Sequence, residues 1–123
     1  MSSFADELLR AAVAHHQQGR LEQAQIIYQQ ILQANQDDPN ALNRLGVVHH
    51  QKGRQAEAEL LIRRAIALAP SVSGFHANLG NALLAQRRAP EAETAYRHAA
   101  DLEPNYAEAW NNLGVALMAQ GKV

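Results

Sequence analysis

Three stretches of the chain share one pattern at one spacing. They read PNALNRLG at residues 39–46, SGFHANLG at 73–80 and AEAWNNLG at 107–114, so that each ends in a Leu–Gly pair and the glycines are 34 residues apart. Other positions keep the same register, namely Ala24, Ala58 and Ala92, and Tyr28, Ile62 and Tyr96. A fixed period of this length predicts an array of similar structural units rather than one compact domain.

The period divides the chain into repeats at 5–38, 39–72 and 73–106, followed by a half repeat at 107–123. Each full repeat holds two segments with apolar residues at i, i+3, i+4 and i+7, the pattern of an amphipathic helix. Pro39 suits a first helical turn, and Gly53 suits a helix end. We therefore predict an all-α array of helices at 4–18, 20–34, 40–52, 54–68, 74–86, 90–102 and 107–120. The short connections between them predict antiparallel hairpins.

The composition excludes several classes of protein. There are 11 basic and 12 acidic residues, which leaves a net charge of −1 and no field that would favour nucleic acid. Cysteine is absent, so disulfides and cysteine-ligated zinc are excluded. No apolar run is long enough to span a bilayer, and the start MSSFADELLR does not read as a signal peptide. We expect a cytoplasmic protein with no membrane partner.

The positions that recur every 34 residues, which we call columns, resemble the tetratricopeptide repeat. This repeat is a helix–turn–helix unit with the pattern W-x₂-L-G-x₂-Y…A-x₃-F…P. Trp110 with Leu113–Gly114 matches its first half, and Ala92, Tyr96 and Pro104 match its second half. The resemblance implies a right-handed α-α superhelix of about 3.5 repeats. The segments ILQANQDDPNALNRLG (31–46) and NYAEAWNNLGVAL (105–117) are also similar to the asparagine-lined arrays that precede the catalytic domain of O-linked N-acetylglucosamine transferases.

The resemblance implies that the first helices of the repeats line a concave groove that binds an extended peptide. An asparagine amide both donates and accepts hydrogen bonds, so spaced asparagines would hold a peptide backbone. Alternatively, these asparagines would be plain polar surface. Arg10 and Arg44 would pair with acidic groups of a partner. Leu9 and Val13 replace the Lys and Asn of the chaperone-type carboxylate clamp, which disfavours an EEVD-like ligand. The candidate groove residues are Arg10, His16, Asn43, Arg44, His50, Asn78, Asn81, Asn111 and Asn112.

The histidine pairs His15–His16 and His49–His50 recur one period apart, which raises the question of a metal site. Adjacent helical residues point about 100° apart, so neither pair can chelate one ion, and we predict no metal and no cofactor. The chain carries no nucleophile or phosphate-loop motif, so we predict no catalytic residue. Carboxylates such as Glu59 and Glu93 stand four residues before Arg63 and Arg97, as in solvated salt bridges.

Small residues at two columns predict where the paired helices of a repeat cross closely. These columns are Ala12, Gly46, Gly80 and Gly114, and Ala24, Ala58 and Ala92. In the half repeat the partner helix is missing, so we expect Trp110, Leu113 and Leu117 to form an exposed apolar strip. Such a strip would allow a homodimer or an exchange of terminal helices.

Three functions are consistent with these observations. The first is a non-catalytic scaffold that binds a protein or peptide segment in its groove. The second is the N-terminal, substrate-recruiting part of a longer bacterial-style enzyme, such as a glycosyltransferase or sulfotransferase, since the half repeat suggests a chain cut from a longer array. The third is self-assembly through the terminal helix.

Overall fold

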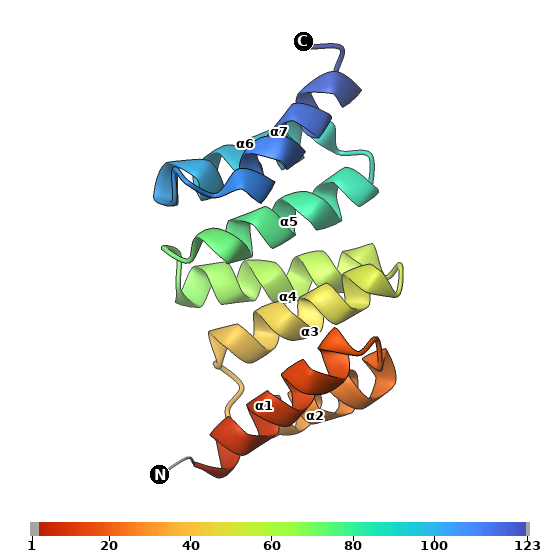
Figure 1. The fold of residues 1–123 in the computed structure, drawn as a ribbon, viewed down its shortest axis with the longest axis vertical. Helices are drawn as coiled ribbons and strands as arrows, with labels where there is room; N and C mark the ends of the chain where they lie inside the picture. Colours follow the sequence, from red (N-terminus) through yellow and green to blue (C-terminus); the bar gives the residue numbers. More distant parts are fainter. Residues whose placement is uncertain (1–2, 123) are drawn as a thin grey trace.

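The computed structural model describes residues 3–122, and these residues form seven helices (Figure 1). Every predicted helix is confirmed, and every predicted end lies within one residue of the observed one. The helices are α1 (Phe4–Gln17), α2 (Leu21–Ala34), α3 (Pro39–Gln51), α4 (Gln55–Leu68), α5 (Ser73–Ala85), α6 (Ala89–Leu102) and α7 (Ala107–Ala119).

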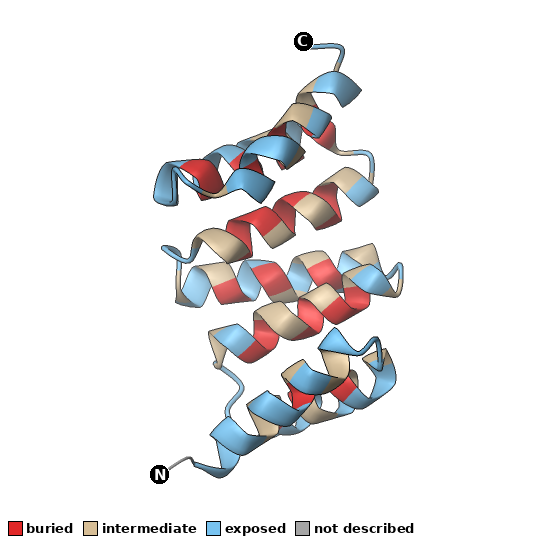
Figure 2. Ribbon diagram, in the orientation of Figure 1, coloured by how far each residue is buried: buried red, intermediate tan, exposed pale blue. Residues whose placement is uncertain are grey.

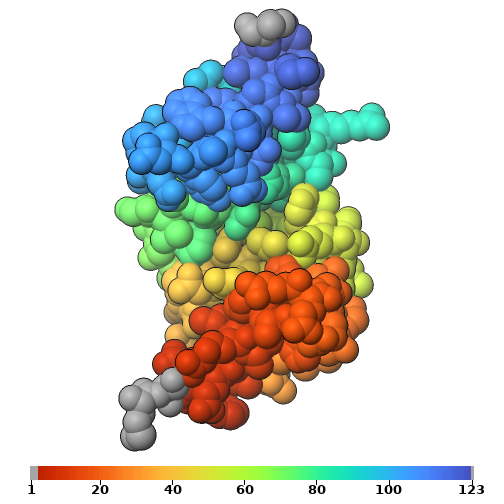
Figure 3. Space-filling view, viewed as in Figure 1, coloured from red at the N-terminus to blue at the C-terminus, as the bar shows by residue number. Residues whose placement is uncertain are grey.

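The helices are stacked as hairpins along one axis, with the two ends of the chain at opposite ends of the stack (Figure 1). The pairs α1 with α2, α3 with α4, and α5 with α6 make up the three full repeats, and α7 packs on α6. Contacts join helices of the same repeat or of adjacent repeats, including α3 with α5 and α5 with α7. The space-filling view shows the same order of layers from the N-terminal to the C-terminal end (Figure 3). The architecture is therefore the expected quasi-linear solenoid.

Helix ends follow from local sequence chemistry. Ser3 and Asp6 form a capping box at the start of α1, and the side chain of Asp38 accepts a hydrogen bond from the backbone N–H of Ala41 at the start of α3. The turn inside each repeat uses one left-handed residue, which is glycine at three of four equivalent positions. Arg87 is the fourth, with a φ of 61° that costs a non-glycine residue free energy.

The apolar interior is spread along the stack as a series of small clusters (Figure 2). The predicted close crossings are confirmed inside the second and third repeats. A Cβ added to Gly46 would lie 2.6 Å from Cγ1 of Ile62, and one added to Gly80 would lie 2.5 Å from Cε1 of Tyr96. The crossing expected at Gly114 is wrong, because no described atom beyond its own helix backbone and chain neighbours lies within 4 Å of such a Cβ. The described chain has no second helix at this point of the stack.

Of the helices in residues 3–122, none has both the length and the apolar character that a membrane crossing requires.

Candidate functional site

The first helices of the repeats share one face of the stack, which we call the first-helix groove. A pocket of about 290 Å³ on this face is lined by residues of α3, α5 and α7 together with Ile62 of α4. Its lining residues are Val47, His50, Gln51, Ile62, Asn78, Asn81 and Glu108. Side chains from successive repeats therefore meet in one recess, as the sequence register predicted for His50, Asn78 and Asn81.

Four of the five predicted asparagines are joined in pairs across the groove. Asn78 Nδ2 donates to Asn43 Oδ1 at 3.0 Å, which links α5 to α3. Asn112 Nδ2 donates to Asn81 Oδ1 at 3.2 Å, which links α7 to α5. Asn111 is exposed and makes no side-chain hydrogen bond within residues 3–122. The amides thus tie the first helices to one another, a role that single-residue reasoning on the sequence missed.

Each of these amides keeps hydrogen-bonding capacity after the pairing. A side-chain amide has two donor hydrogens and one acceptor oxygen. In the described part of the chain, Nδ2 of Asn43 and Asn81 and Oδ1 of Asn78 and Asn112 have no hydrogen-bond partner. The groove therefore offers both donors and acceptors along α3, α5 and α7.

The histidines of the groove are engaged with neighbouring side chains. His16 Nε2 donates to Gln51 Oε1 at 2.6 Å, which links α1 to α3, and the His16 ring lies edge-on to Tyr28. His50 Nδ1 donates to Gln55 Oε1 at 2.7 Å. Both rings are therefore oriented by the fold. Together with the two asparagine pairs, the His16–Gln51 bond means that a polar contact joins each successive pair of first helices.

The two predicted arginines lie at the N-terminal end of the groove. Arg10 is exposed and Arg44 is half-buried, and neither forms a salt bridge within residues 3–122. Burial raises the pKa of Tyr28, and the nearby Arg44 guanidinium partly opposes that effect. The guanidinium groups of Arg10 and Arg44 are therefore not held in ion pairs within the described residues.

A second set of polar contacts repeats on the second helices, and its links between repeats were not predicted. Glu59 accepts hydrogen bonds from Arg63 at 2.8 Å, Arg88 at 2.7 Å and Gln86 at 3.1 Å. Burial alone would raise the pKa of Glu59, but these donors lower it to about 2. The predicted Glu59–Arg63 pair is confirmed, yet Glu59 also joins the second repeat to the third.

The same contact occurs one period away in each direction. Glu93 accepts from Arg97, Gln120 and Lys122, and Lys52 donates to Gln25 and Glu22. The acceptors Gln25, Glu59 and Glu93 occupy one column of the repeat. The donors occupy two columns, of which the first holds Lys52, Gln86 and Gln120 and the second holds Arg88 and Lys122. These spacings of 34 were a usable signal in the sequence.

Comparisons with known proteins agree with this geometry. The family model described as tetratricopeptide repeat matches residues 9–73, and a model described as TPR repeat matches residues 80–121. The chain belongs to the tetratricopeptide repeat family. A search of curated protein sequences finds no significant match.

Solved structures similar to this tetratricopeptide chain include an enzyme and peptide complexes. The O-GlcNAc transferase of Thermobaculum terrenum matches with a TM-score of 0.84 and 31% identity over 95% of this chain. This chain spans only 23% of the transferase chain. The first tetratricopeptide domain of Spaghetti, bound to an HSP90 peptide, matches with a TM-score of 0.90 and 25% identity over 96% of this chain and 94% of that one.

A more distant structure shows the fold alone. The type III secretion chaperone SycD of Yersinia enterocolitica, in complex with a YopD peptide, has a TM-score of 0.86 and 18% identity, over 98% of this chain and 97% of that one. The predicted resemblance to tetratricopeptide arrays, including those of O-GlcNAc transferases, is confirmed.

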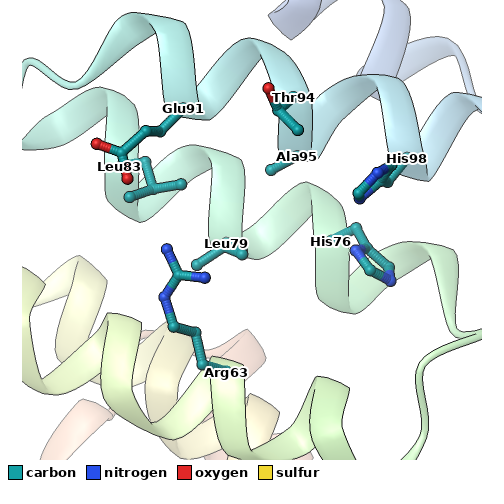
Figure 4. A pocket seen from close by; sticks show the side chains of 8 residues that line it. All are labelled: Arg63, His76, Leu79, Leu83, Glu91, Thr94, Ala95 and His98. Atoms are coloured by element: carbon teal, nitrogen blue, oxygen red, sulfur yellow. The ribbon is translucent and has the colours of Figure 1, made fainter.

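A second recess of the array lies away from the groove, between α4, α5 and α6 (Figure 4). It has a volume of about 240 Å³, and Arg63, His76 and His98 surround a floor that includes Leu79. Its charges are already compensated, because Arg63 pairs with Glu59 and Glu91 pairs with Arg88. No group of three potential metal ligands occurs among the described residues.

One of the two histidines of this recess, His76, has a structural role. His76 Nε2 donates to the Pro70 carbonyl at 2.8 Å, and Trp110 Nε1 donates to the Pro104 carbonyl at 2.9 Å one period later. His76 therefore replaces the tryptophan of the repeat pattern. His49 is buried, and its Nδ1 has no hydrogen-bond partner among the described residues. His15 is half-buried and accepts from Arg20.

The terminal helix differs from its predicted description at Leu113 as well as at Gly114. Trp110 is 49% exposed, and Leu117 is half-buried beside the last apolar cluster. Leu113 was expected to be exposed, but only 4% of it is, because it packs with Leu83 and Tyr96 of the third repeat. The exposed apolar residues of α7 are instead Trp110, Val115 and Met118.

Proposed function

We propose that this tetratricopeptide array is a protein-interaction scaffold that binds an extended peptide segment along the first-helix groove. The observation that carries the proposal is the row of amides on α3, α5 and α7. Their mutual hydrogen bonds fix the side chains in place and leave donors and acceptors free at Asn43, Asn78, Asn81 and Asn112. Fixed groups lose little entropy on binding, which favours affinity. The peptide complex of Spaghetti supports a peptide as the ligand.

Amide groups match the chemistry of a peptide backbone. Each peptide bond has one donor and one acceptor, and an asparagine amide satisfies both without contacting the side chain of the ligand. The groove would therefore hold many sequences in an extended form. The guanidinium groups of Arg10 and Arg44, which form no salt bridge in the described residues, would add a preference for an acidic residue at one end, since guanidinium groups bind carboxylates in a bidentate manner.

The test is a fluorescence screen of the full chain against a random peptide library. Peptides selected by the wild-type chain are then measured against the Asn78→Ala, Asn112→Ala double variant. Each lost hydrogen bond to a peptide removes about 0.5–1.5 kcal/mol, so binding should weaken about tenfold. Asn105→Ala is the matched control, because Asn105 is exposed and lies in the loop after α6. Equal binding by the double variant and the control would refute the groove as the site.

A recruiting region of a larger enzyme is the second candidate. It is supported by the T. terrenum O-GlcNAc transferase, of which this chain matches less than a quarter. The repeats would then present a bound protein to a catalytic domain of the glycosyltransferase or sulfotransferase type. The reading frame beyond Val123 tests this proposal: a catalytic domain there supports it, and a stop codon contradicts it.

Association of two copies through α7 is the third candidate. It is supported by the exposed Trp110 and Met118, since large apolar side chains on a surface favour contact with another chain. Light scattering over a hundredfold concentration range tests it. A mass that rises to twice the monomer value supports the dimer, and a constant monomer mass excludes it.

A further inference from the structure

The pocket of the first-helix groove contains a carboxylate that has no basic partner. Glu108 of α7 lines this recess of about 290 Å³ together with side chains of α3, α4 and α5. On the second helices Glu22, Glu59, Glu91 and Glu93 are held in salt bridges, whereas Glu108 forms none within residues 3–122. Within the described chain no lysine or arginine lines the recess. Because its walls come from four helices that are all present, the recess is a property of the array itself.

Two further groups of this recess are hydrogen-bond acceptors. Asn78 donates through Nδ2 to Asn43, so its Oδ1 has no partner among the described residues. Gln55 Nε2 donates to the backbone carbonyl of His50 at 3.1 Å, which turns Gln55 Oε1 toward the His50 ring. Nδ1 of His50 therefore carries the hydrogen of their 2.7 Å bond, and Nε2 of the neutral ring keeps a lone pair.

Glu108 lies at the exposed rim of the recess and close to its polar wall. The Tyr96 hydroxyl donates to Asn81, which lines the same recess. Burial raises the pKa of Tyr96, and the negative charge of Glu108 raises it further. The carboxylate therefore lies near the Tyr96–Asn81 pair, where it can also contact a ligand in the groove.

We infer that this recess receives a lysine or arginine side chain of the peptide bound in the first-helix groove. The inference rests on the proposed function and adds the chemistry of one ligand residue to it. Val47 and Ile62 are the apolar lining residues, and they would pack along the aliphatic stem of that side chain. Its cationic end would bind the Glu108 carboxylate and Oδ1 of Asn78, since hydrogen bonds between charged groups are the strong ones.

Other side chains fit this lining less well. An acidic side chain would find a donor in Nδ2 of Asn81, but it would also face the Glu108 carboxylate, and like charges repel. A neutral side chain would displace water from that carboxylate without offering a positive charge, which costs free energy. The charge of Glu108 therefore decides in favour of a basic residue.

The two ends of the groove would then select opposite charges. Arg10 and Arg44 lie on α1 and α3 and form no salt bridge in the described residues, whereas Glu108 lies on α7. The preferred ligands are therefore peptides with an acidic residue for the α1–α3 end and a basic residue for the α7 end. Such a requirement restricts the ligands of a groove whose amides alone would accept many sequences.

The first test is selection from a random peptide library by the full chain and three variants. The wild type should enrich lysine or arginine at one position of the selected peptides. Glu108→Gln keeps the shape of the side chain, so it should lose this enrichment, and Glu108→Lys should enrich aspartate or glutamate there instead. Glu57→Gln is the matched control, because Glu57 is exposed on α4, outside the recess, and forms no salt bridge in the described chain.

The second test measures one selected peptide and its analogue with norleucine in place of the basic residue. Norleucine keeps the aliphatic stem and removes the charge. The wild type should bind the analogue about fivefold more weakly, a modest ratio because Glu108 is exposed. Glu108→Gln should bind the two peptides equally, since the effect of one change depends on the other. Thermal unfolding of Glu108→Gln should match that of the wild type, because no salt bridge is lost.

The outcomes separate this inference from the proposed function. Peptides that bind the groove without enrichment of a basic residue, or with equal enrichment by wild type and Glu108→Gln, would overturn the inference and leave peptide binding intact. Equal binding of the norleucine analogue by the wild type would do the same. A wild-type chain that selects no peptide at all would overturn both.

Discussion

The phenolic hydroxyl of Tyr96 donates a 2.6 Å hydrogen bond to Oδ1 of Asn81. The same oxygen accepts from Nδ2 of Asn112, so one amide of α5 joins the second helix of its own repeat to the first helix of the next. Burial raises the pKa of Tyr96 above its ordinary value, so this hydroxyl stays protonated and a donor even in alkaline solution where an exposed tyrosine ionises. The groove side chains are therefore held by the buried interior of the array.

Asn81→Ala should destabilise the fold by about 1–3 kcal/mol, because it leaves the buried Tyr96 hydroxyl without an acceptor. Urea unfolding followed by circular dichroism measures the change. Asn105→Ala, in an exposed loop, should stay within about 0.5 kcal/mol of the wild type. Equal stabilities for the two variants would mean that the Tyr96–Asn81 bond contributes nothing.

Gly80→Ala and Gly114→Ala should change stability in opposite directions. Alanine favours a helix over glycine by about 1 kcal/mol, and at position 114 the added Cβ meets no neighbour. At position 80 it would lie 2.5 Å from the ring of Tyr96, and overpacking costs about 1–3 kcal/mol. Thermal unfolding should therefore show a higher Tm for Gly114→Ala and a lower one for Gly80→Ala. The same direction of change in both would contradict the observed packing.

Arg87→Gly should stabilise the array by about 0.5–1 kcal/mol. Arg87 has a φ of 61°, where glycine occurs at the three equivalent turns and avoids the strain of a side chain. Arg88→Gly is the neighbouring control and should destabilise, because Arg88 pairs with both Glu59 and Glu91. Chemical denaturation of both variants gives the comparison, and a loss of stability in Arg87→Gly would argue against strain at this turn.

Stability should fall in acid as Glu59 takes up a proton. Its pKa is about 2 in the folded chain against an ordinary value of 4.5, so the unfolded chain binds the proton first as the pH falls. The contribution of Glu59 is therefore complete above pH 4.5 and is lost between about pH 4.5 and 2. Glu59→Gln should flatten the stability curve over that window. A wild-type slope in Glu59→Gln would assign the acid sensitivity to other carboxylates.

The sequence predicted the helices closely because each boundary carries a local signal, such as Pro39 or Gly53, and because the period repeats that signal. It also predicted that Asn43 and Asn78 share one face. It did not predict that the two bond to each other, since that contact depends on the stacking of successive repeats. The contacts of Glu59 and Glu93 could have been predicted from the sequence, because the two glutamates are one period apart and so are their donors.

The prediction for Leu113 failed for a definite reason. A residue of the half repeat was expected to face only the missing helix, but α7 also packs on α6 and α5, and Leu113 lies in that contact. The close crossing predicted at Gly114 failed for the opposite reason. Gly114 lies only on the side of α7 that no described helix covers. A helix at the end of a stack has one covered side and one open side, and the periodic pattern alone does not divide its residues between them.

The most direct test of peptide binding in the groove is a titration of the isotope-labelled chain, followed through its asparagine side-chain amide resonances. With a peptide selected from the library, the resonances of Asn43, Asn78, Asn81 and Asn112 should shift together and saturate, while that of Asn105 stays constant. Shifts confined to residues outside the first-helix groove, with these four amides unchanged, would contradict the proposed function.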